Sequence, residues 1–588
     1  MNQPTATPSG GSNAMKRYLP VIAIAVVAAL VLALLLWPKG DDGSSAGDTT
    51  AAPTTGAATT TPATDGGGST AVDTSAPFFF EEAQAAGIAD TIDWTDRCDT
   101  SVGRYAYPSP YAMPCIAPFT GDNGGATAKG VTADSIKIVV YQAQENDPII
   151  QFIAGQVEND DTNEQQADTI TKISDMFGHF SELYGRKLVF EFYTATGVAN
   201  DTVSAKADAT AIAEMEPFAV WGSPAFAGKP FAEELAAQQV LCLCTGGGDA
   251  KFVQERAPYL VTLVPSVTQG TLLLAEFVGK RLLGGKAEHS GDFVDVDRKI
   301  GLVYLSTTAD SQNQAETLNK TIKDNYGGEL ADLVPYTIDP ATLQEQAATI
   351  IARLKSAGIT TVIFVGDPVA PISLTQEATA QSYFPEWVLG GSGYTETTAF
   401  ARTYDQQQWQ HAFGVCWYAA PVDLDKAGPY RRYTWYYEEE PAARESVNDL
   451  ESNAAFLHYF IQAAGPNLSP QSFIDAMFNI AQAQGDAPLT ALRLSWGNKD
   501  RWPAELEPDY YGVDDQTEIW WDATATGQDE LGREGTGMYR WVEGGKRYYP
   551  GERPNDPGKF FVQEGSVDRY TDLPASEALP DYPRPTGI

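Results

Sequence analysis

Short polar loops follow several of the strands that the sequence predicts, and their residues are the ones that could do chemistry. The loops carry hydroxyl groups, carboxylates and glycines, and a glycine lets a ligand approach the backbone closely. The candidate ligand-binding residues are Gln142, Gly222, Ser223, Pro224, Thr245 and Gly246 in the first half of the chain, and Thr308, Asp310, Asp367, Tyr394 and Glu396 in the second half. For any one of them, a simple turn or helix cap explains the residue nearly as well.

The acidic candidates in the second half have two interpretations. Asp310, Asp367 or Glu396 could face a cationic group of a ligand, and Tyr394 could cover an apolar part of it. Helix capping is the more ordinary role for Asp310 and Asp367.

Catalysis has little support in the sequence. The chain contains no G-x-S-x-G nucleophile elbow, no H-E-x-x-H helix and no phosphate-binding loop, since the glycines at 246–248 lack the downstream Gly-Lys of a nucleotide site. We therefore expect neither enzymatic activity nor a cofactor.

Cysteine and histidine give no pattern typical of a metal site. The four histidines show no ligand spacing with one another or with the five cysteines. In an oxidising compartment Cys98 and Cys115, which flank a loop rich in Pro and Tyr, would form a disulfide. Cys242 and Cys244 are two apart on one apolar strand, so we expect both to pack in a core; their redox state and that of Cys416 stay open.

Apolar strands and amphipathic helices alternate along the chain in two series, and these elements must position the loops. The strands are expected at 136–141, 186–193, 217–221, 240–244 and 260–263, then at 300–304, 333–338, 361–365, 386–390 and 414–418. The intervening helices are expected at 164–184, 202–215, 228–239, 268–283, 313–326, 341–357 and 371–381, followed by two further helices at 449–464 and 470–481.

This alternation predicts an α/β fold with two doubly wound parallel-sheet lobes, a hinge and an interlobe cleft. Ligands of such sheets bind outside the carboxyl ends of the strands, which is why the loops after them are the candidates. The hinge is expected near Pro265–Gly270 and Trp417–Pro421. Residues 515–549 are expected to form terminal strands, with a turn within WWDATATG.

An apolar segment near the N-terminus predicts a membrane anchor. Residues 21–37 carry no charge, and with the residues before them they approach the length that crosses a bilayer. Lys16 and Arg17 precede the segment, so residues 1–17 are expected to be a cytoplasmic tail, 18–38 a single transmembrane helix, and the main domain extracytoplasmic. The alternative is a cleaved signal peptide, with a weak cleavage site around 44–47.

The remaining boundaries follow from composition. We expect a disordered Thr/Ala/Gly/Pro linker at 39–76, a disulfide-stapled extension at 77–129 and a C-terminal extension at 551–588. Lobe 1 is expected to comprise 130–266 and about 446–514, and lobe 2 to comprise 267–420 and about 515–550. The net charge of −38 would repel phosphate backbones, so nucleic acid is not an expected partner.

Several stretches, taken in order, resemble one known family. They are GVTADSIKIVVY at 130–141, VWGSPAFAG at 220–228, PYLVTLVPSVTQG at 258–270, IGLVYLSTTADSQN at 300–313, VIFVGDP at 362–368 and NAAFLHYFIQAAG at 453–465. From about Gly130 to Tyr549 the chain is similar to the type I extracytoplasmic solute-binding proteins of ABC transporters, in the branch that binds branched-chain amino acids and amides. The segment before it looks like an extension found in actinobacterial members.

The resemblance implies capture of a small polar solute, such as an amino acid or an amide, for an ABC permease. The loop at 142–148 departs from the Gly-containing loop of the amino-acid-binding members, which argues against an α-amino-acid ligand. The same fold also serves ligand sensors and surface protein-interaction modules, and this alternative stays open.

Overall fold

The computed structural model describes residues 77–244, 248–307, 310–480 and 487–586. The expected tail, membrane helix and linker at 1–17, 18–38 and 39–76 lie outside this part of the chain, as do Thr245, Gly246 and Thr308. The chain divides into two units after Ala71, and all the described residues belong to the second. Within the described residues, no helix combines the length and the apolar character that crossing a membrane requires.

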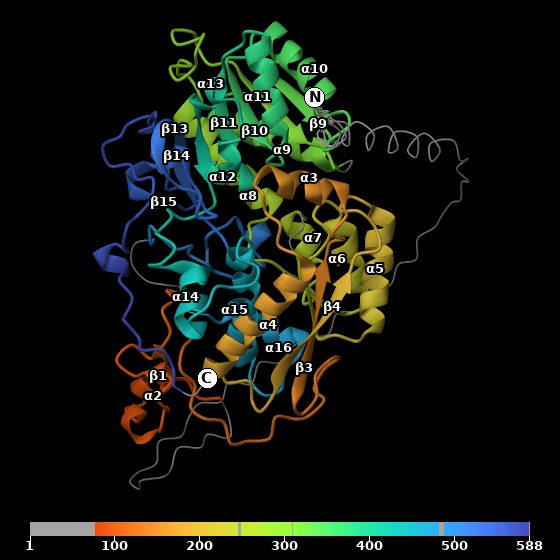
Figure 1. Cartoon of the computed structure of the whole chain (residues 1–588), viewed down its shortest axis with the longest axis vertical. Coiled ribbons are helices and arrows are strands. Elements are labelled where there is room, and N and C mark those ends of the chain that lie inside the picture. The colour runs from red at the N-terminus through yellow and green to blue at the C-terminus, as the bar shows by residue number, and fades with distance from the viewer. Residues whose placement is uncertain (1–76, 245–247, 308–309, 481–486, 587–588) are drawn as a thin grey trace, which may run out of the picture. The chain divides into compact units, whose positions relative to one another are not determined.

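The first sheet is entirely parallel and has the order β4-β3-β5-β6-β7 (Figure 1). Its strands are β3 Ser135–Gln142, β4 Lys187–Thr194, β5 Ala219–Trp221, β6 Leu241–Leu243 and β7 Leu260–Val261. The helices that accompany it are α4 Asn163–Phe180, α5 Thr202–Glu214, α6 Gly228–Ala237, α7 Ala250–Gln254, α15 Val447–Ala464 and α16 Pro470–Phe478. Helices α5 and α6 pack together, whereas α15 packs on α4 and α16.

The second sheet has the order β14-β13-β12-β11-β10-β8-β9, and β15 also pairs with β13. Its five parallel strands are β8 Ile300–Leu305, β9 Asp332–Tyr336, β10 Thr361–Val365, β11 Glu386–Gly390 and β12 Ala412–Cys416. Its antiparallel strands are β13 Gln516–Gln528, β14 Glu534–Trp541 and β15 Arg547–Tyr548. The α/β fold with two parallel-sheet lobes is therefore the one that the alternating pattern predicts.

Helices cover both faces of the second sheet, and the strand sequences explain why. In β8, Ile300, Leu302 and Tyr304 belong to one buried cluster, whereas Val303 belongs to another, because successive side chains of a strand point to opposite faces. The cluster of Leu302 includes side chains of α8 Val267–Phe277 and α9 Asp310–Tyr326. The cluster that contains Val303 includes side chains of α10 Leu343–Ser356 and α11 Ala370–Ala380. A continuous apolar run is what a doubly covered strand requires.

Two details of the second sheet differ from the sequence expectation. Strand β12 begins and ends two residues earlier than predicted, because the carbonyl groups of Trp417 and Tyr418 accept hydrogen bonds from Arg547 instead of continuing the ladder. The turn predicted within WWDATATG is wrong. Strand β13 continues through this segment with only a change of register between Asp522 and Thr526. The chain turns at 529–533, where the Asp529 carboxylate accepts two backbone N–H groups.

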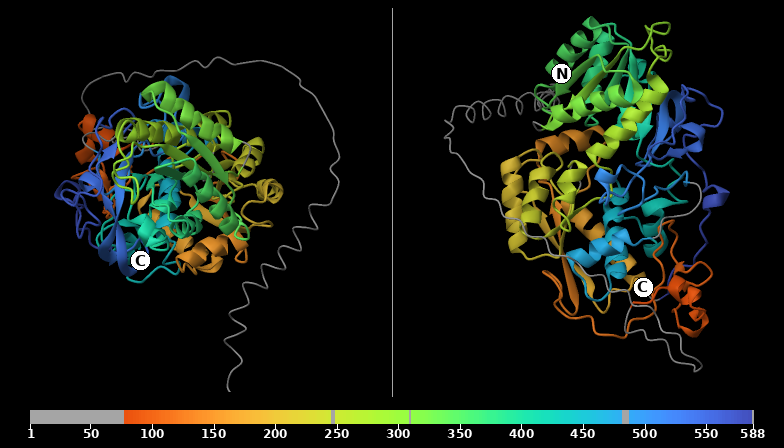
Figure 2. Two further views of the ribbon diagram at one scale, coloured as in Figure 1. Left: turned by 90° about the horizontal axis from the view of Figure 1, so that it is seen from above. Right: turned by 180° about the vertical axis from the view of Figure 1, so that it is seen from behind.

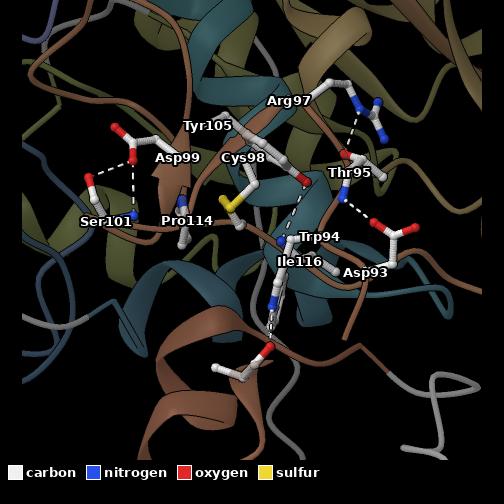
Figure 3. Close-up of a disulfide and its surroundings, with 12 residues drawn as sticks. Asp93, Trp94, Thr95, Arg97, Cys98, Asp99, Ser101, Tyr105, Pro114 and Ile116 are labelled. Carbon is white, nitrogen blue, oxygen red and sulfur yellow. Dashed lines mark hydrogen bonds between the residues drawn. A yellow bond between two sulfur atoms is a disulfide. The ribbon is translucent and has the colours of Figure 1, made fainter. Parts of the chain in front are cut away.

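The segment before the first sheet folds onto the first lobe. Cys98 and Cys115 form a disulfide (Figure 3). Their Cα atoms lie 5.8 Å apart. Beside it, the Tyr105 hydroxyl accepts the Ile116 N–H, and the indole N–H of Trp94 donates to the Ala89 carbonyl. Tyr105 and Trp94 are buried in the core cluster that contains the first sheet.

The C-terminal segment returns to the same region, as the orange-red and dark blue ends of the ribbon in Figure 2 show. The Tyr582 hydroxyl donates to Asp99, and the Trp435 indole donates to the Tyr582 carbonyl oxygen, both at 2.9 Å. Trp435 lies on α14 Gly428–Tyr437, a helix that the sequence analysis did not predict.

The remaining cysteines are buried. Cys242 and Cys244 lie in the core of the first lobe, as expected, with their sulfur atoms side by side. Cys416, at the end of β12, is a free thiol.

Among the histidines, His458 on α15 is the most enclosed, with 1% of its surface exposed. Its two ring nitrogens lie 2.9 Å and 2.8 Å from the hydroxyl groups of Ser174 and Ser181. Burial lowers the pKa of His458 to about 3, because the charged imidazolium would lose its water there. The ring is therefore a neutral hydrogen-bonding element of the core.

This burial predicts acid sensitivity. Below pH 6.5 the unfolded chain binds a proton at His458 that the folded chain does not, so stability should fall as the pH drops from about 6.5 toward 3. Between pH 7 and 4.5 the His458→Gln variant should lose roughly 2 to 3 kcal/mol less unfolding free energy than the parent, measured by urea unfolding. The half-buried His179, changed to Gln, is the control and should reduce the loss less. Equal pH slopes in the His458 variant and the parent would contradict the assignment.

Candidate functional site

A cavity of about 120 Å³ lies at the carboxyl edge of the first sheet. It forms where β3, β4 and β5 end, and these strands are neighbours in the sheet. Its lining residues are Tyr141, Ala143, Asp147, Ile150, Ala195, Gly197, Ala199, Ser223, Pro224 and Ala225. The carboxyl edge of a parallel sheet is where ligands of such folds bind.

Asp147 shapes one wall of the cavity by capping α3 Pro148–Gln156. One carboxylate oxygen accepts the N–H groups of Ile149 and Ile150 at 2.8 Å and 3.1 Å. The other accepts the Ala199 N–H at 2.6 Å, which joins the start of α3 to the loop after β4. This carboxylate is 1% exposed and therefore holds two segments of the wall together.

Tyr141, near the end of β3, brings a phenol to the wall. Its ring packs at 5.0 Å, edge to face, against Phe231 of α6 and at 6.4 Å against Tyr193 of β4. Burial raises the pKa of Tyr141 well above its usual value, so the phenol stays protonated at physiological pH. Tyr193 in turn donates to the buried carboxylate of Asp208 at 2.9 Å.

Of the residues predicted in the first half, the structure brings Ser223 and Pro224 to the cavity wall. Gly222 lies just before them with φ +90°, and a Cβ there would lie 3.3 Å from the Tyr141 carbonyl oxygen, so glycine is needed for this close approach. Gln142 does not line the cavity. It is buried, and its amide nitrogen donates to the Asn163 carbonyl oxygen at 2.9 Å.

Two carboxylates predicted in the second half are engaged by their own loops. Asp367 is buried and accepts the N–H groups of Val369 and Ala370 at the start of α11, both at 2.9 Å, together with the hydroxyl of Tyr336. This agrees with the capping interpretation.

Glu396 lies in the short helix η3 Tyr394–Glu396 and closes a tight turn. Its carboxylate accepts the N–H groups of Ser392 at 3.0 Å and Gly393 at 2.6 Å. Burial raises the pKa of Glu396 to about 8. With 1% of its surface exposed, the side chain is not presented to a ligand.

The other two residues predicted there make contacts with the first lobe. Asp310, the first residue of α9, accepts a hydrogen bond from Lys229 of α6 at 2.6 Å, and this ion pair lowers the pKa of Asp310. Tyr394 donates its hydroxyl proton to Asp449 of α15 at 3.0 Å. Both residues therefore hold the two lobes together in this conformation.

Helix α3 lies between the two lobes and was not predicted (Figure 1). Ile149 belongs to the buried cluster of the second sheet, and Ile150, Phe152 and Ile153 pack against that cluster. A chain segment that follows the first strand of lobe 1 thus contributes to the core of lobe 2.

The residues after α3 are tied to both lobes. In the turn between β13 and β14, Arg533 donates to the carbonyl oxygens of Val157 and Glu158, the latter at 2.9 Å. The Asp161 carboxylate accepts the Ser446 N–H, just before α15, at 2.7 Å. These bonds fix the segment that follows α3.

Three segments cross between the lobes. Residues after β7 lead into α8, residues after β12 lead toward α14, and residues 511–515 lead into β13. The first and third run side by side, since the Val513 N–H donates to the Leu263 carbonyl oxygen at 3.0 Å. The two segments predicted as hinge are thus two of the three crossings.

Arg547 joins the second and third crossings. Its guanidinium contacts the Asp515 carboxylate at 2.7 Å and 2.9 Å and donates to the carbonyl oxygens of Trp417 and Tyr418 at 2.9 Å and 3.0 Å. The side chains of Arg547 and Asp515 are both fully buried. A planar guanidinium with several donors suits this arrangement.

The part of the chain that the structure describes holds no group of three or more His, Cys, Asp or Glu residues arranged for a metal ion. The cavity wall contains no cysteine or histidine, and its one serine, Ser223, has no histidine beside it in that wall. The cavity wall thus presents hydroxyl groups, backbone groups and apolar surface, a combination typical of binding sites.

No protein-family model and no curated protein sequence matches the chain. Similar solved structures are type I periplasmic and ABC-transporter solute-binding proteins at low identity. An ABC transporter substrate-binding protein from Sphaerobacter thermophilus is 13% identical, covers 72% of this chain and 100% of its own, and has a TM-score of 0.48. The branched-chain amino acid transporter substrate binding protein from Streptococcus pneumoniae, in complex with isoleucine, is 12% identical, with coverage of 71% and 100% and a TM-score of 0.46. A solute binding protein from Rhodopseudomonas palustris, in complex with 3,4-dihydroxybenzoic acid, is 11% identical, with coverage of 71% and 98% and a TM-score of 0.46.

The Arg547 junction predicts a large loss of stability when its cation is removed. The Arg547→Met variant leaves Asp515 buried without its partner, which should cost about 3 to 5 kcal/mol of unfolding free energy, and the double variant with Asp515→Leu should recover most of it. Urea unfolding measures both. The control is Arg353→Met, because Arg353 pairs with Asp332 while half exposed and should cost at most about 1 kcal/mol. A loss at Arg547 no larger than the control would refute the assignment.

The packing of α3 predicts that Ile149 stabilises the contact between the lobes. Ile149→Ala removes buried methyl groups from the core of the second lobe and should cost about 2 to 5 kcal/mol. Amide hydrogen exchange should accelerate within 148–156. Val203→Ala, at a side chain 78% exposed, is the matched control and should change stability by less than about 0.5 kcal/mol. If exchange within α3 is unchanged, the helix is not held by this contact.

Proposed function

We propose that the chain is an extracytoplasmic solute-binding protein, which captures a small solute between its two lobes and presents it to an ABC-type importer. The observation that carries the proposal is the cavity at the carboxyl ends of β3, β4 and β5, in a chain whose two sheets are linked by crossing segments. Lobes linked in this way can open and close around a bound solute.

The contacts between the lobes support a closing motion. The Lys229–Asp310 ion pair and the Tyr394–Asp449 hydrogen bond join side chains that are partly exposed. Partly exposed pairs of this kind contribute little stability, so they can form and break as a solute arrives and leaves. The buried junction at Arg547 would stay intact meanwhile and act as the fixed part of the hinge.

We also propose that the chain is anchored in the membrane by its N-terminal segment. Residues 18–38 would hold the protein in the membrane with residues 1–17 in the cytoplasm, and the lobes would face the outside, where a permease receives the solute. The apolar character of 21–37 and the basic pair before it support this arrangement.

The proposal predicts that a small solute stabilises the chain through this cavity. A thermal-shift screen of the full chain in mild detergent should yield a solute that raises the melting temperature, since ligand at 100 times its dissociation constant contributes about 2.7 kcal/mol. The shift should vanish in Ala143→Leu, which fills the cavity without removing a polar group.

The matched control is Thr349→Leu, which fills a separate surface groove between β9 and α10. It should leave the shift intact. If Thr349→Leu abolishes the shift and Ala143→Leu does not, the solute binds in the other groove and the proposed site is wrong. A folded chain that no solute stabilises would instead favour a protein-interaction module.

A further inference from the structure

The cavity wall offers no basic side chain. None of its described lining residues is Lys, Arg or His. Residues 245–247 and 308–309, which the structure does not describe, read Thr-Gly-Gly and Thr-Ala and contain no ionisable side chain. An anionic solute would lose its water at this wall without gaining a cationic partner. The net charge of −38 adds a repulsive field.

The one carboxylate in the wall already has partners. Asp147 accepts three backbone N–H groups, from Ile149, Ile150 and Ala199. Those bonds cap α3 and attach it to the loop after β4. A cationic solute would compete with the groups that hold the wall itself together.

The charged residues at nearby strand ends are also paired. Lys229 and Asp310 bind each other. Asp208, buried on α5, accepts hydrogen bonds from the hydroxyl groups of Tyr193 and Thr196 and from the Thr196 N–H. Asp367 and Glu396, in the second lobe, accept backbone N–H groups of their own loops. Asp208, Asp367 and Glu396 are thus buried and engaged in these hydrogen bonds, whereas Lys229 and Asp310, which are partly exposed, have each other as partner.

The rest of the wall consists of four alanines, Gly197, Pro224 and Ile150, together with Tyr141 and Ser223, which carry hydroxyl groups. Its volume corresponds to roughly four water molecules at their volume in the liquid. Apolar surface with a few hydrogen-bonding groups suits a compact molecule that has an apolar body and a polar, uncharged head.

We infer that the solute is uncharged at physiological pH: a neutral molecule with an apolar body and a hydrogen-bonding head, and not a carboxylate, an amine or an amino-acid zwitterion. This inference rests on the proposed function and narrows the class of solute that the same cavity takes. Only hydrogen bonds and apolar contacts are needed for recognition, since no buried charge has to be balanced.

Two sets of isosteric probes test the inference. Benzamide, benzoate and benzamidinium share a size and a planar head but are neutral, anionic and cationic, and isobutyramide, isobutyrate and isobutyramidinium form a smaller set. Binding to the full chain in mild detergent is measured by titration calorimetry. At least one neutral amide should bind about 100-fold more tightly than both of its charged counterparts, which corresponds to about 2.7 kcal/mol, and its binding should be lost in Ala143→Leu but kept in Thr349→Leu.

Two results would overturn the inference while the proposed function survives. One is tighter binding by a benzoate or isobutyrate ion, lost in Ala143→Leu. The other is tighter binding by an amidinium ion, lost in Ala143→Leu and in Asp147→Asn, which would show that the Asp147 carboxylate receives a cation.

If none of the six probes binds, the charge of a solute found in the thermal-shift screen tests the inference instead. A neutral solute whose binding is lost in Ala143→Leu supports the inference, and a charged one overturns it. If neither the probes nor the screen yields binding that Ala143→Leu removes, the proposed function fails together with the inference.

Discussion

The buried guanidinium of Arg547 is the constraint on which the arrangement of the two sheets depends. A chain that passes between two sheets three times must bury backbone groups at the crossings, where no ladder can satisfy them. Arg547 supplies donors to two carbonyl groups of the second crossing, and its charge is balanced by Asp515 of the third. Leu263 and Val513 complete the link to the first. The three crossings therefore form one rigid junction, and relative motion of the lobes must occur around it.

A second regularity concerns the acidic residues at strand ends. Most of them satisfy N–H groups at the starts of helices or in tight turns, which have no partner within the helix. Asp147, Asp367 and Glu396 all do so. The acidity of the chain is thus partly used to build the loops at the carboxyl edges of the sheets. The cavity wall at the first sheet is therefore mainly apolar, and its remaining polar groups are hydroxyl and backbone groups.

Periodicity made much of the fold predictable, because apolar runs of five to eight residues identify doubly covered strands. The predicted strand ends located the carboxyl edge of the first sheet, and this edge pointed to Ser223 and Pro224 as residues of the cavity wall. The partners of Asp310 and Tyr394 were not predictable, since Lys229 and Asp449 are distant in sequence and meet them only in the tertiary structure. Helix α3 was missed although Asp147 followed by Pro148 is a strong helix start. The segment after that start has only a narrow exposed face, with Gln151 and Gly155, because lobe 2 covers its other side, so its helical period is weak.

The position of α3 has a consequence for how the protein would respond to solutes. Its apolar side chains pack into the core of the second lobe, so parting the lobes exposes that surface to water. A solute that enters only when the lobes part binds a minor state, and its apparent affinity is reduced by the fraction of molecules in that state. Weakly complementary molecules would then remain below detection at concentrations where a well-fitted one saturates the protein. The packing of α3 would thereby lower the apparent affinity for every solute, so that only a solute with high intrinsic affinity occupies the site at low concentration.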